Sequence, residues 1–329
     1  MGEDSGRPGA LSAGSRACAE EQLGPSKLRL WSHDRFTFPL PPRHRFPLRK
    51  YRLLRERIIA DELVAPTAVL ESQAVSWEQL ALVHGAGMLE RLRHGGLSRR
   101  QLQAIGLPWS PELVERARRA TGGTVAAARD AAAWGIGMNL GGGTHHAGPD
   151  ASRGYCLVND VAVAVAALRA QGEAERVLVV DCDVHQGDGT AQIFAGDRDT
   201  FTLSLHGAVN YPFTRIPSDL DLDLPTGTGD DDYMAALSDA LSFALPRAAP
   251  DIIFYLAGAD PWEGDRLGRL SLSKDGLRAR DEMVLAHAAA ARAAACVVLA
   301  GGYADDVSDT VDINVGTVRA VVEHTAARL

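Results

Sequence analysis

The sequence has no paired cysteines, no excess of basic charge and no long apolar run, and each absence excludes a class of protein. Its four cysteines form no CxxC pair, which argues against a disulfide framework and against a cysteine zinc site. Because 42 acidic residues outnumber 34 basic ones, giving a net charge of −8, no global basic field is available to bind nucleic acid. No apolar run approaches the roughly 20 residues of a membrane-spanning helix. We therefore expect a cytoplasmic protein with no membrane span and no nucleic-acid partner.

The first residues of the chain differ in composition from the remainder. They are rich in Gly, Ser and Ala without periodicity, so we expect residues 1–26 to form a disordered lead. From there on, short apolar runs alternate with longer helical patterns and no second linker appears, which is typical of a parallel sheet with helices on both faces. We predict an α/β fold with a single domain, residues 27–329. The preference for Arg over Lys and the abundance of Ala suggest a high-GC bacterial genome.

Five apolar runs predict the strands of this sheet, and six longer patterns predict helices. The predicted strands are 135–140, 176–181, 200–206, 251–260 and 295–303. The predicted helices are 46–59, 76–92, 111–134, 161–170, 230–245 and 277–295, and Ser76 with Gln79 has the spacing of a capping box. Each predicted strand ends in polar or glycine-rich sequence. Since ligands bind beyond the carboxyl ends of parallel strands, these ends should converge on one crevice.

The stretch VLVVDCDVHQGDGT crowds metal-binding side chains into the end of one strand. On an extended segment, residues two apart point to the same side, so Asp181, Asp183 and His185 share a direction. Carboxylate oxygen and imidazole nitrogen suit zinc, iron(II), cobalt or manganese, and a mononuclear catalytic site needs three protein ligands and an open position for water. Asp260 ends another strand, where an unpaired buried charge would be costly. It is the best candidate for the ligand from a second strand.

The same acids allow a plainer interpretation. An Asp-x-Asp at a strand end can cap the next helix through its backbone N–H groups, and Asp188 with Gly189 and Thr190 can form an ordinary turn. Each acid taken alone favours that interpretation. The whole set, with His185 inside it, favours a metal site.

Two adjacent histidines follow three glycines in GGGTHHAGPD. The glycines let the backbone come close to a ligand, and His145 and His146 then enter from one loop. Spacing alone leaves open whether they bind metal, move protons or lie at the surface. As a general base and acid, each would need a carboxylate on its far ring nitrogen, and Asp181 and Asp188 are available for that role.

Two tyrosines and one helix start complete the candidate residues. Tyr303 follows two glycines at a strand end, where its phenol could donate a hydrogen bond to developing negative charge, although alone it is typical of the edge of a core. Tyr155 could line an apolar channel, and Asn159 or Asp160 could cap the buried helix that follows.

Six motifs, in this order, resemble the successive signatures of the zinc-dependent histone deacetylase superfamily. They cover about residues 28–325 and read GGGTHHA, GYCLVND, VDCDVHQGDGT, LSLH, GADPWEGDRLGRLSLS and AGGY. The EGDRLGRLSLS run, the HQGDG form and FPLRKYRLLRE are most similar to class IV histone deacetylases and their bacterial relatives. The resemblance implies an arginase/deacetylase-like fold with a central parallel sheet.

The resemblance implies one zinc ion per chain, held by Asp183, His185 and Asp260. It also implies a potassium ion near the zinc loop. The potassium ligands would be backbone carbonyls of Asp181, Asp183, His185, Ser204 and Leu205.

The resemblance assigns the proton chemistry as well. His146 matches the general base and acid and His145 its electrostatic partner, and Asp181 and Asp188 stand behind the two histidines. Tyr303 matches the tyrosine that polarises the scissile carbonyl.

The remaining matches concern the acyl-lysine channel. Tyr155, beside Gly154, matches one wall, and Tyr211 or Phe213 would supply the opposite wall. Leu267 stands where polyamine-specific relatives have a glutamate, which argues against an acetylpolyamine. Two departures put peptide binding in question: VHGAGMLERL carries small residues where many relatives have bulky ones, and no aspartate can be placed at the channel rim.

The implied activity is that of a metal-dependent amidohydrolase acting on linear amides. The expected substrate is an Nε-acyl-lysine, acetyl or longer fatty acyl, hydrolysed by metal-activated water with a histidine base and a tyrosine that stabilises the oxyanion. The alternative is deacetylation of small acylated amines, such as acetylpolyamines. A two-manganese ureohydrolase needs further Asp and His ligands, and a silent acyl-lysine binding module would have lost a catalytic residue. No oligomeric state is predicted.

Overall fold

The computed structural model describes residues 1, 28–42 and 44–327. Apart from Met1, the lead predicted for residues 1–26 therefore lies outside the described residues. Its strands are β1 (Leu30–Ser32), β2 (Val69–Glu71), β3 (Ile136–Asn139), β4 (Val177–Asp181), β5 (Thr200–Gly207), β6 (Leu220–Leu224), β7 (Ile252–Ala257) and β8 (Ala294–Leu299). These form one 8-stranded sheet in the order β2-β1-β3-β8-β7-β4-β5-β6. Every neighbouring pair is parallel.

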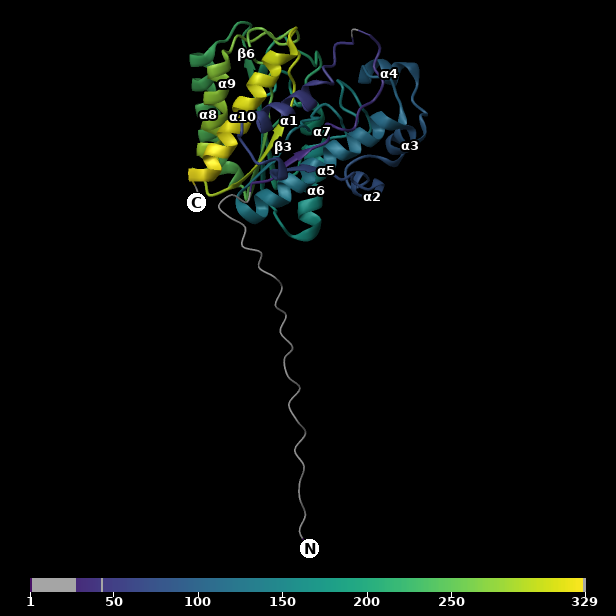
Figure 1. Cartoon of the computed structure of the whole chain (residues 1–329), viewed down its shortest axis with the longest axis horizontal. Coiled ribbons are helices and arrows are strands. Elements are labelled where there is room, and N and C mark those ends of the chain that lie inside the picture. The colour runs from purple at the N-terminus through teal and green to yellow at the C-terminus, as the bar shows by residue number, and fades with distance from the viewer. Residues whose placement is uncertain (2–27, 43, 328–329) are drawn as a thin grey trace.

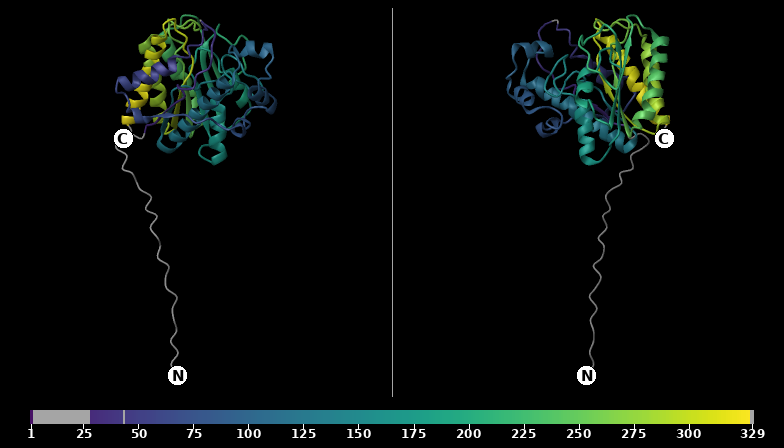
Figure 2. Two further views of the ribbon diagram at one scale, coloured as in Figure 1. Left: turned by 45° about the vertical axis from the view of Figure 1, so that its right-hand side comes forward. Right: turned by 180° about the vertical axis from the view of Figure 1, so that it is seen from behind.

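Helices cover both faces of this sheet (Figures 1 and 2), which confirms the predicted fold class. They are α1 (Lys50–Ala60), α2 (Trp77–Leu80), α3 (Ala86–His94), α4 (Arg99–Ile105), α5 (Pro111–Trp134), α6 (Asp160–Gln171), α7 (Asp188–Phe194), α8 (Asp230–Ala248), α9 (Lys274–Ala290) and α10 (Val307–Ala327). A short 3₁₀ helix, Pro66–Ala68, precedes β2. None of the helices in the described residues is long and apolar enough to cross a bilayer.

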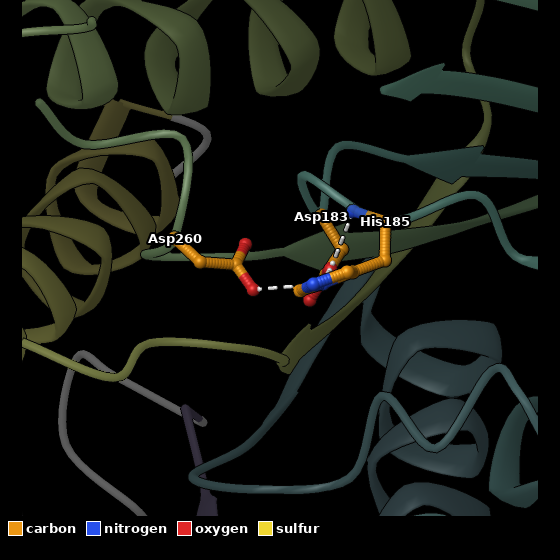
Figure 3. Close-up of side chains that lie close together, drawn as sticks. All are labelled: Asp183, His185 and Asp260. Carbon is orange, nitrogen blue, oxygen red and sulfur yellow. Dashed lines mark hydrogen bonds and ion pairs between the residues drawn. The ribbon is translucent and has the colours of Figure 1, made fainter. Parts of the chain in front are cut away.

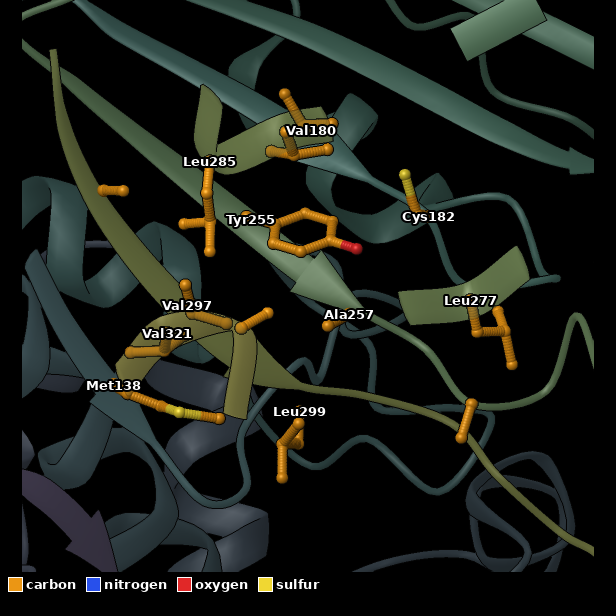
Figure 4. Packing of buried hydrophobic residues seen from close by; sticks show 14 of the residues in the cluster. Met138, Val180, Cys182, Tyr255, Ala257, Leu277, Leu285, Val297, Leu299 and Val321 are labelled. Atoms are coloured by element: carbon orange, nitrogen blue, oxygen red, sulfur yellow. The ribbon is translucent and has the colours of Figure 1, made fainter. Parts of the chain in front are cut away.

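The two faces of the sheet carry two separate apolar clusters. Along β4, Leu178 and Val180 belong to the cluster under α1, α8, α9 and α10, whereas Val177 and Val179 belong to the cluster under α2, α3, α5 and α6. This alternation is the two-residue period of an extended chain with both faces buried. Figure 4 shows the first cluster, where Val180 lies beside Tyr255 and Leu285.

The long helix α5 spans the predicted range, residues 111–134. Ser110 caps it by accepting a hydrogen bond from Leu113 N at 3.1 Å, and Pro111 takes the first turn, where no donor is lost. The paired glycines Gly122 and Gly123 inside the helix allow close packing. A Cβ on Gly122 would lie 1.7 Å from the Gln73 carbonyl oxygen.

The prediction of one continuous helix over residues 76–92 is wrong, because the structure has two helices there. The capping box of Ser76 and Gln79 is confirmed, but α2 ends at Leu80 and α3 begins only at Ala86. Between them lies buried His84, whose Nδ1 is 3.0 Å from Gly148 O and whose Nε2 accepts from Asn159 N at 2.9 Å. These tertiary contacts hold the turn between the two helices. Because they join residues far apart in the sequence, the local hydrophobic pattern could not predict the break.

Other predicted boundaries were too long. The 46–59 helix starts at Lys50, and the helix predicted over 277–295 ends at Ala290 because Arg292 turns the chain with a φ of 57°. The strands predicted to reach residues 260 and 303 end at Ala257 and Leu299. Their last residues form loops at the carboxyl edge of the sheet, where the polar residues lie.

Candidate active site

The loops after β3, β4, β7 and β8, together with the loop after β5, line one cavity of about 530 Å³ at the carboxyl edge of the sheet. These four strands are adjacent because β8 and β7 lie between β3 and β4, although they come later in the chain. Ligands bind at such a point in parallel sheets. The lining includes all predicted channel residues, both histidines of the pair and the predicted oxyanion tyrosine: Gly154, Tyr155, Tyr211, Phe213, Leu267, His145, His146 and Tyr303.

Three predicted metal ligands form a buried cluster at the base of this cavity (Figure 3). Asp183 and His185 follow β4, and Asp260 follows β7. One donor atom from each lies within 4.8 Å of the others. His185 Nδ1 is 2.8 Å from Asp183 Oδ1 and 3.3 Å from Asp260 Oδ2.

The cluster fits a divalent metal ion. Two buried carboxylates face one imidazole, and within the described residues the only donor near Asp260 Oδ2 is His185 Nδ1, at 3.3 Å. Burial acts to lower the pKa of His185, but bonds to Asp183 and Asp260 outweigh it and raise the pKa to about 10. The site therefore attracts positive charge, and two oxygens with one nitrogen suit zinc. A Cβ on Gly301 would lie 1.8 Å from Asp260 Oδ2, so only glycine fits there.

The adjacent histidines each contact one of the two carboxylates that the sequence made available to them. His145 Nδ1 lies 2.6 Å from Asp181 Oδ2, and His146 Nδ1 lies 2.7 Å from Asp188 Oδ1. All four side chains are buried, and the two ring centroids are 4.1 Å apart. With Nδ1–H donated to Asp188, His146 keeps Nε2 as its free nitrogen, whereas His145 Nε2 lies 3.8 Å from Asp183 Oδ1.

The pKa values of these two histidines are shifted in opposite directions. Burial acts to lower the pKa of His145, but Asp181 and Asp183 more than compensate and raise it to about 9. Burial and the charge of His145 lower the pKa of His146 to about 3, against the opposite effect of Asp188. At neutral pH His145 is therefore a cation and His146 a neutral ring, a division that suits an electrostatic partner and a base.

The loop before these histidines is fixed by a carboxylate at the start of α6. Asp160 accepts hydrogen bonds from Gly143 N at 3.1 Å and Thr144 N at 2.7 Å. Gly142 and Gly143 have φ angles of 87° and 62°, which favour glycine. Asn159, not Asp160, caps α6, because its side chain accepts from Ala162 N.

Tyr303 faces the same cavity from the loop after β8. Its backbone N–H donates to Asp265 Oδ2 at 2.6 Å, and its ring centroid lies 5.8 Å from that of Tyr155. Burial raises the pKa of its phenol, so the hydroxyl stays protonated and can donate a hydrogen bond. Buried Lys50 places its ammonium 5.6 Å from this ring and donates to Ala300 O at 3.1 Å.

A sequence model of the histone deacetylase domain matches residues 44–316 of the chain. The chain belongs to the histone deacetylase family. As a member of this family it is a metal-dependent amidohydrolase, as predicted.

Individual relatives agree with this assignment. A histone deacetylase-like amidohydrolase of Pseudomonas aeruginosa is 34% identical over 276 residues, which cover 77% of this chain and 71% of that protein. An uncharacterized protein of Picosynechococcus sp. is 41% identical over 296 residues, covering 90% of this chain and 97% of that protein. The solved structure of a deacetylase homolog from Aquifex aeolicus has a TM-score of 0.77 at 22% identity, with 90% and 84% of the two chains covered, and shows the shared fold.

The walls of the deacetylase cavity are aromatic. Tyr211 lies edge-on to His146, with ring centroids 4.9 Å apart, whereas Phe213 is 87% exposed at the mouth. Of the two residues predicted for the second wall, Tyr211 is thus the inner one. Gly154 lies flat against His146, where an added Cβ would be 2.4 Å from Cδ2 of the ring.

Arg153 supports the deacetylase's His146 and was missed from the sequence. Its Nε donates to the His146 carbonyl oxygen at 2.9 Å, and its Nη1 is 3.2 Å from Asp188 Oδ2. The only sequence signal was its place next to the glycine and tyrosine of the GYCLVND motif.

Arg280 joins the two loops that carry the predicted metal ligands. This fully buried side chain donates through Nη1 to the carbonyl oxygens of Cys182 at 3.2 Å and Gly258 at 2.7 Å. Its Nη2 and Nε bind Asp281 Oδ1 at 2.8 and 3.0 Å. Cys182 precedes the predicted ligand Asp183, and Gly258 lies two residues before the predicted ligand Asp260. The guanidinium therefore holds the backbone of both ligand-bearing loops.

Arg280→Lys is expected to weaken zinc binding about tenfold, because lysine keeps the charge beside Asp281 but cannot reach both carbonyls with a planar fork. The measurement is zinc affinity by competition with a chromophoric chelator. Arg278→Lys is the matched control, since Arg278 lies on the same helix, is half exposed and pairs with Glu282. Unchanged affinity in Arg280→Lys would show that the fork does not position the ligands.

The potassium ion implied for the carbonyls around β4 and β5 stays a prediction, because no contact among the described residues tests it. Asp183 is the one acidic residue that lines the cavity among the residues described.

Proposed function

We propose that this deacetylase hydrolyses the amide of an Nε-acyl-lysine, with acetyl or a longer fatty acyl group, and resembles class IV enzymes in doing so. The observation that carries the proposal is the convergence on one cavity of a metal-ligand cluster, two His–Asp pairs and a protonated tyrosine. These are the groups that amide hydrolysis needs: an electrophile, a base and a donor for the oxyanion.

We propose that Asp183, His185 and Asp260 hold a zinc ion. When bound, zinc would polarise the acyl carbonyl and lower the pKa of a water molecule. His146 accepts the proton of the attacking water at Nε2, because its Nδ1 faces Asp188, and later gives a proton to the leaving amine. His145 keeps positive charge beside it.

Tyr303 donates its phenolic hydrogen to the carbonyl oxygen as negative charge develops there. Deacetylation of small acylated amines would use the same residues. An acetylpolyamine is disfavoured, because Leu267 is apolar and no carboxylate other than Asp183 lines the cavity within the described chain.

The test is hydrolysis of one lysine peptide carrying acetyl, octanoyl or myristoyl groups by the zinc-loaded protein. Tyr303→Phe is expected to lower kcat by roughly a hundredfold or more with KM little changed, because the lost hydrogen bond forms in the transition state. The rates with the three acyl groups give the chain-length preference. Absence of turnover on all three peptides and on free Nε-acyl-lysine, or a wild-type kcat in Tyr303→Phe, would contradict the proposal.

A further inference from the structure

The charged residues of the cavity point to the kind of amine that enters it. Apart from its histidines, two basic side chains line it among the described residues, Lys50 and Arg269, and the one carboxylate there is Asp183. Lys50 is buried at the inner end beside Tyr303, and Asp183 belongs to the metal-ligand cluster. Arg269 is exposed and is therefore the charge that a substrate meets outside the reacting amide.

The guanidinium of Arg269 is free to bind a ligand. Its one side-chain hydrogen bond in the described residues runs from Nη1 to the adjacent Gly268 O at 2.9 Å, and no carboxylate there lies within ion-pair distance. Neighbouring arginines are paired: Arg266 Nε is 3.0 Å from Asp305, and Arg215 Nη2 is 3.8 Å from Asp223. Most of the five N–H donors of the Arg269 guanidinium therefore have no protein partner among the described residues and remain available to a ligand.

The surroundings of Arg269 favour an anion over a cation. Leu267, two residues earlier, lines the cavity, and Val209 and Phe213 expose 61% and 87% of their surface at the same mouth. Apolar neighbours weaken competition by water for a charged pair. A cationic amine would find repulsion at Arg269 and no acidic side chain to pair with.

We propose that Arg269 binds a carboxylate on the amine side of the substrate, so that the preferred substrates are N-acyl amines whose amine chain carries a carboxylate at its far end, as in free Nε-acyl-lysine. A guanidinium recognises carboxylate in a bidentate manner, which gives direction as well as charge. The inference rests on the proposed function and names the substrate class for that same site.

The experiment compares kcat/KM for three acetylated amines with the same chain: Nε-acetyl-lysine, its α-carboxamide and N-acetylcadaverine, which is acetyl-lysine without its carboxylate. The wild-type protein is expected to prefer the acid roughly tenfold over both others. Arg269→Gln removes this preference by slowing hydrolysis of the acid alone. Arg269→Glu reverses it in favour of N-acetylcadaverine, and added salt reduces it in the wild type.

Arg266→Gln is the matched control, because Arg266 is a nearby exposed arginine that pairs with Asp305 and does not line the cavity. It should leave the preference unchanged. Equal hydrolysis of the three amines, hydrolysis of lysine peptides but of none of the three, or an equal loss on all three in Arg269→Gln overturns the role of Arg269 while the proposed function stands. If neither peptides nor amines are hydrolysed, both fail.

Discussion

Asp183→Ala is expected to lower amide hydrolysis at least a thousandfold, because it removes one of three ligands from an ion that supplies several kcal/mol of charge stabilisation. Asp183 Oδ1 also accepts from the backbone and ring nitrogens of His185, and Oδ2 accepts from Gly301 N at 2.7 Å. The substitution therefore releases His185 and empties a buried polar site. We expect zinc to dissociate from the variant under conditions in which the wild type retains one equivalent.

Metal content and kcat/KM should be measured on the same preparation, with folding checked by circular dichroism. Asp275→Ala is the control, because Asp275 is 92% exposed at the start of α9 and should leave both quantities at wild-type values. A folded Asp183→Ala protein that keeps its zinc would show that the metal is bound elsewhere.

His146→Ala is expected to reduce kcat by roughly a hundredfold to ten-thousandfold, the range for loss of a positioned general base. Zinc should remain bound, since His146 belongs to no metal-ligand cluster in the described residues and its Nδ1 contacts Asp188. This retention separates the prediction from the one for Asp183. The measurement is kcat at saturating substrate, with the metal content determined on the same protein preparation.

His287→Ala is the control for that variant, because His287 lies on α9, is not among the residues that line the cavity, and its Nδ1 lies 2.9 Å from Met283 O. A kcat within twofold of the wild type in His146→Ala would assign the base to another group, of which His145 is the first to test.

The candidate site could be predicted largely because its residues are local in sequence. Asp181, Asp183 and His185 alternate along the sequence, and the period of a strand predicted that they share a direction. In the structure β4 ends at Asp181, and Asp183 and His185 lie in the bend that follows it. Their association with Asp260 followed from a rule about parallel strands, which the positions of β4 and β7 obey.

The supporting residues could not be predicted in the same way. Arg280 is 98 positions from Cys182, and Lys50 is 250 positions from Ala300, so neither contact leaves a pattern along the chain. The break between α2 and α3 depends on His84 in the same manner.

Some elements were missed because their local preference opposes their final state. Helix α10 is rich in Val and Thr, which have low helix propensity, yet Val311, Val318 and Val321 are buried on it and packing prevails. Strand β6 reads LDLDL and is half exposed at the sheet edge, so it forms no continuous apolar run. Strands β1 and β2 have three residues each, too few for a periodic signal.

The most direct test of the central claim is a zinc titration of the metal-free protein, with Asp183→Ala beside it, followed by hydrolysis of an acetyl-lysine peptide. We predict that wild-type activity rises linearly with added zinc, stops rising at one zinc per chain, and stays near zero in the variant. Full activity in the metal-free protein, or the same titration curve in Asp183→Ala, would contradict the assignment of Asp183, His185 and Asp260 as the catalytic metal site.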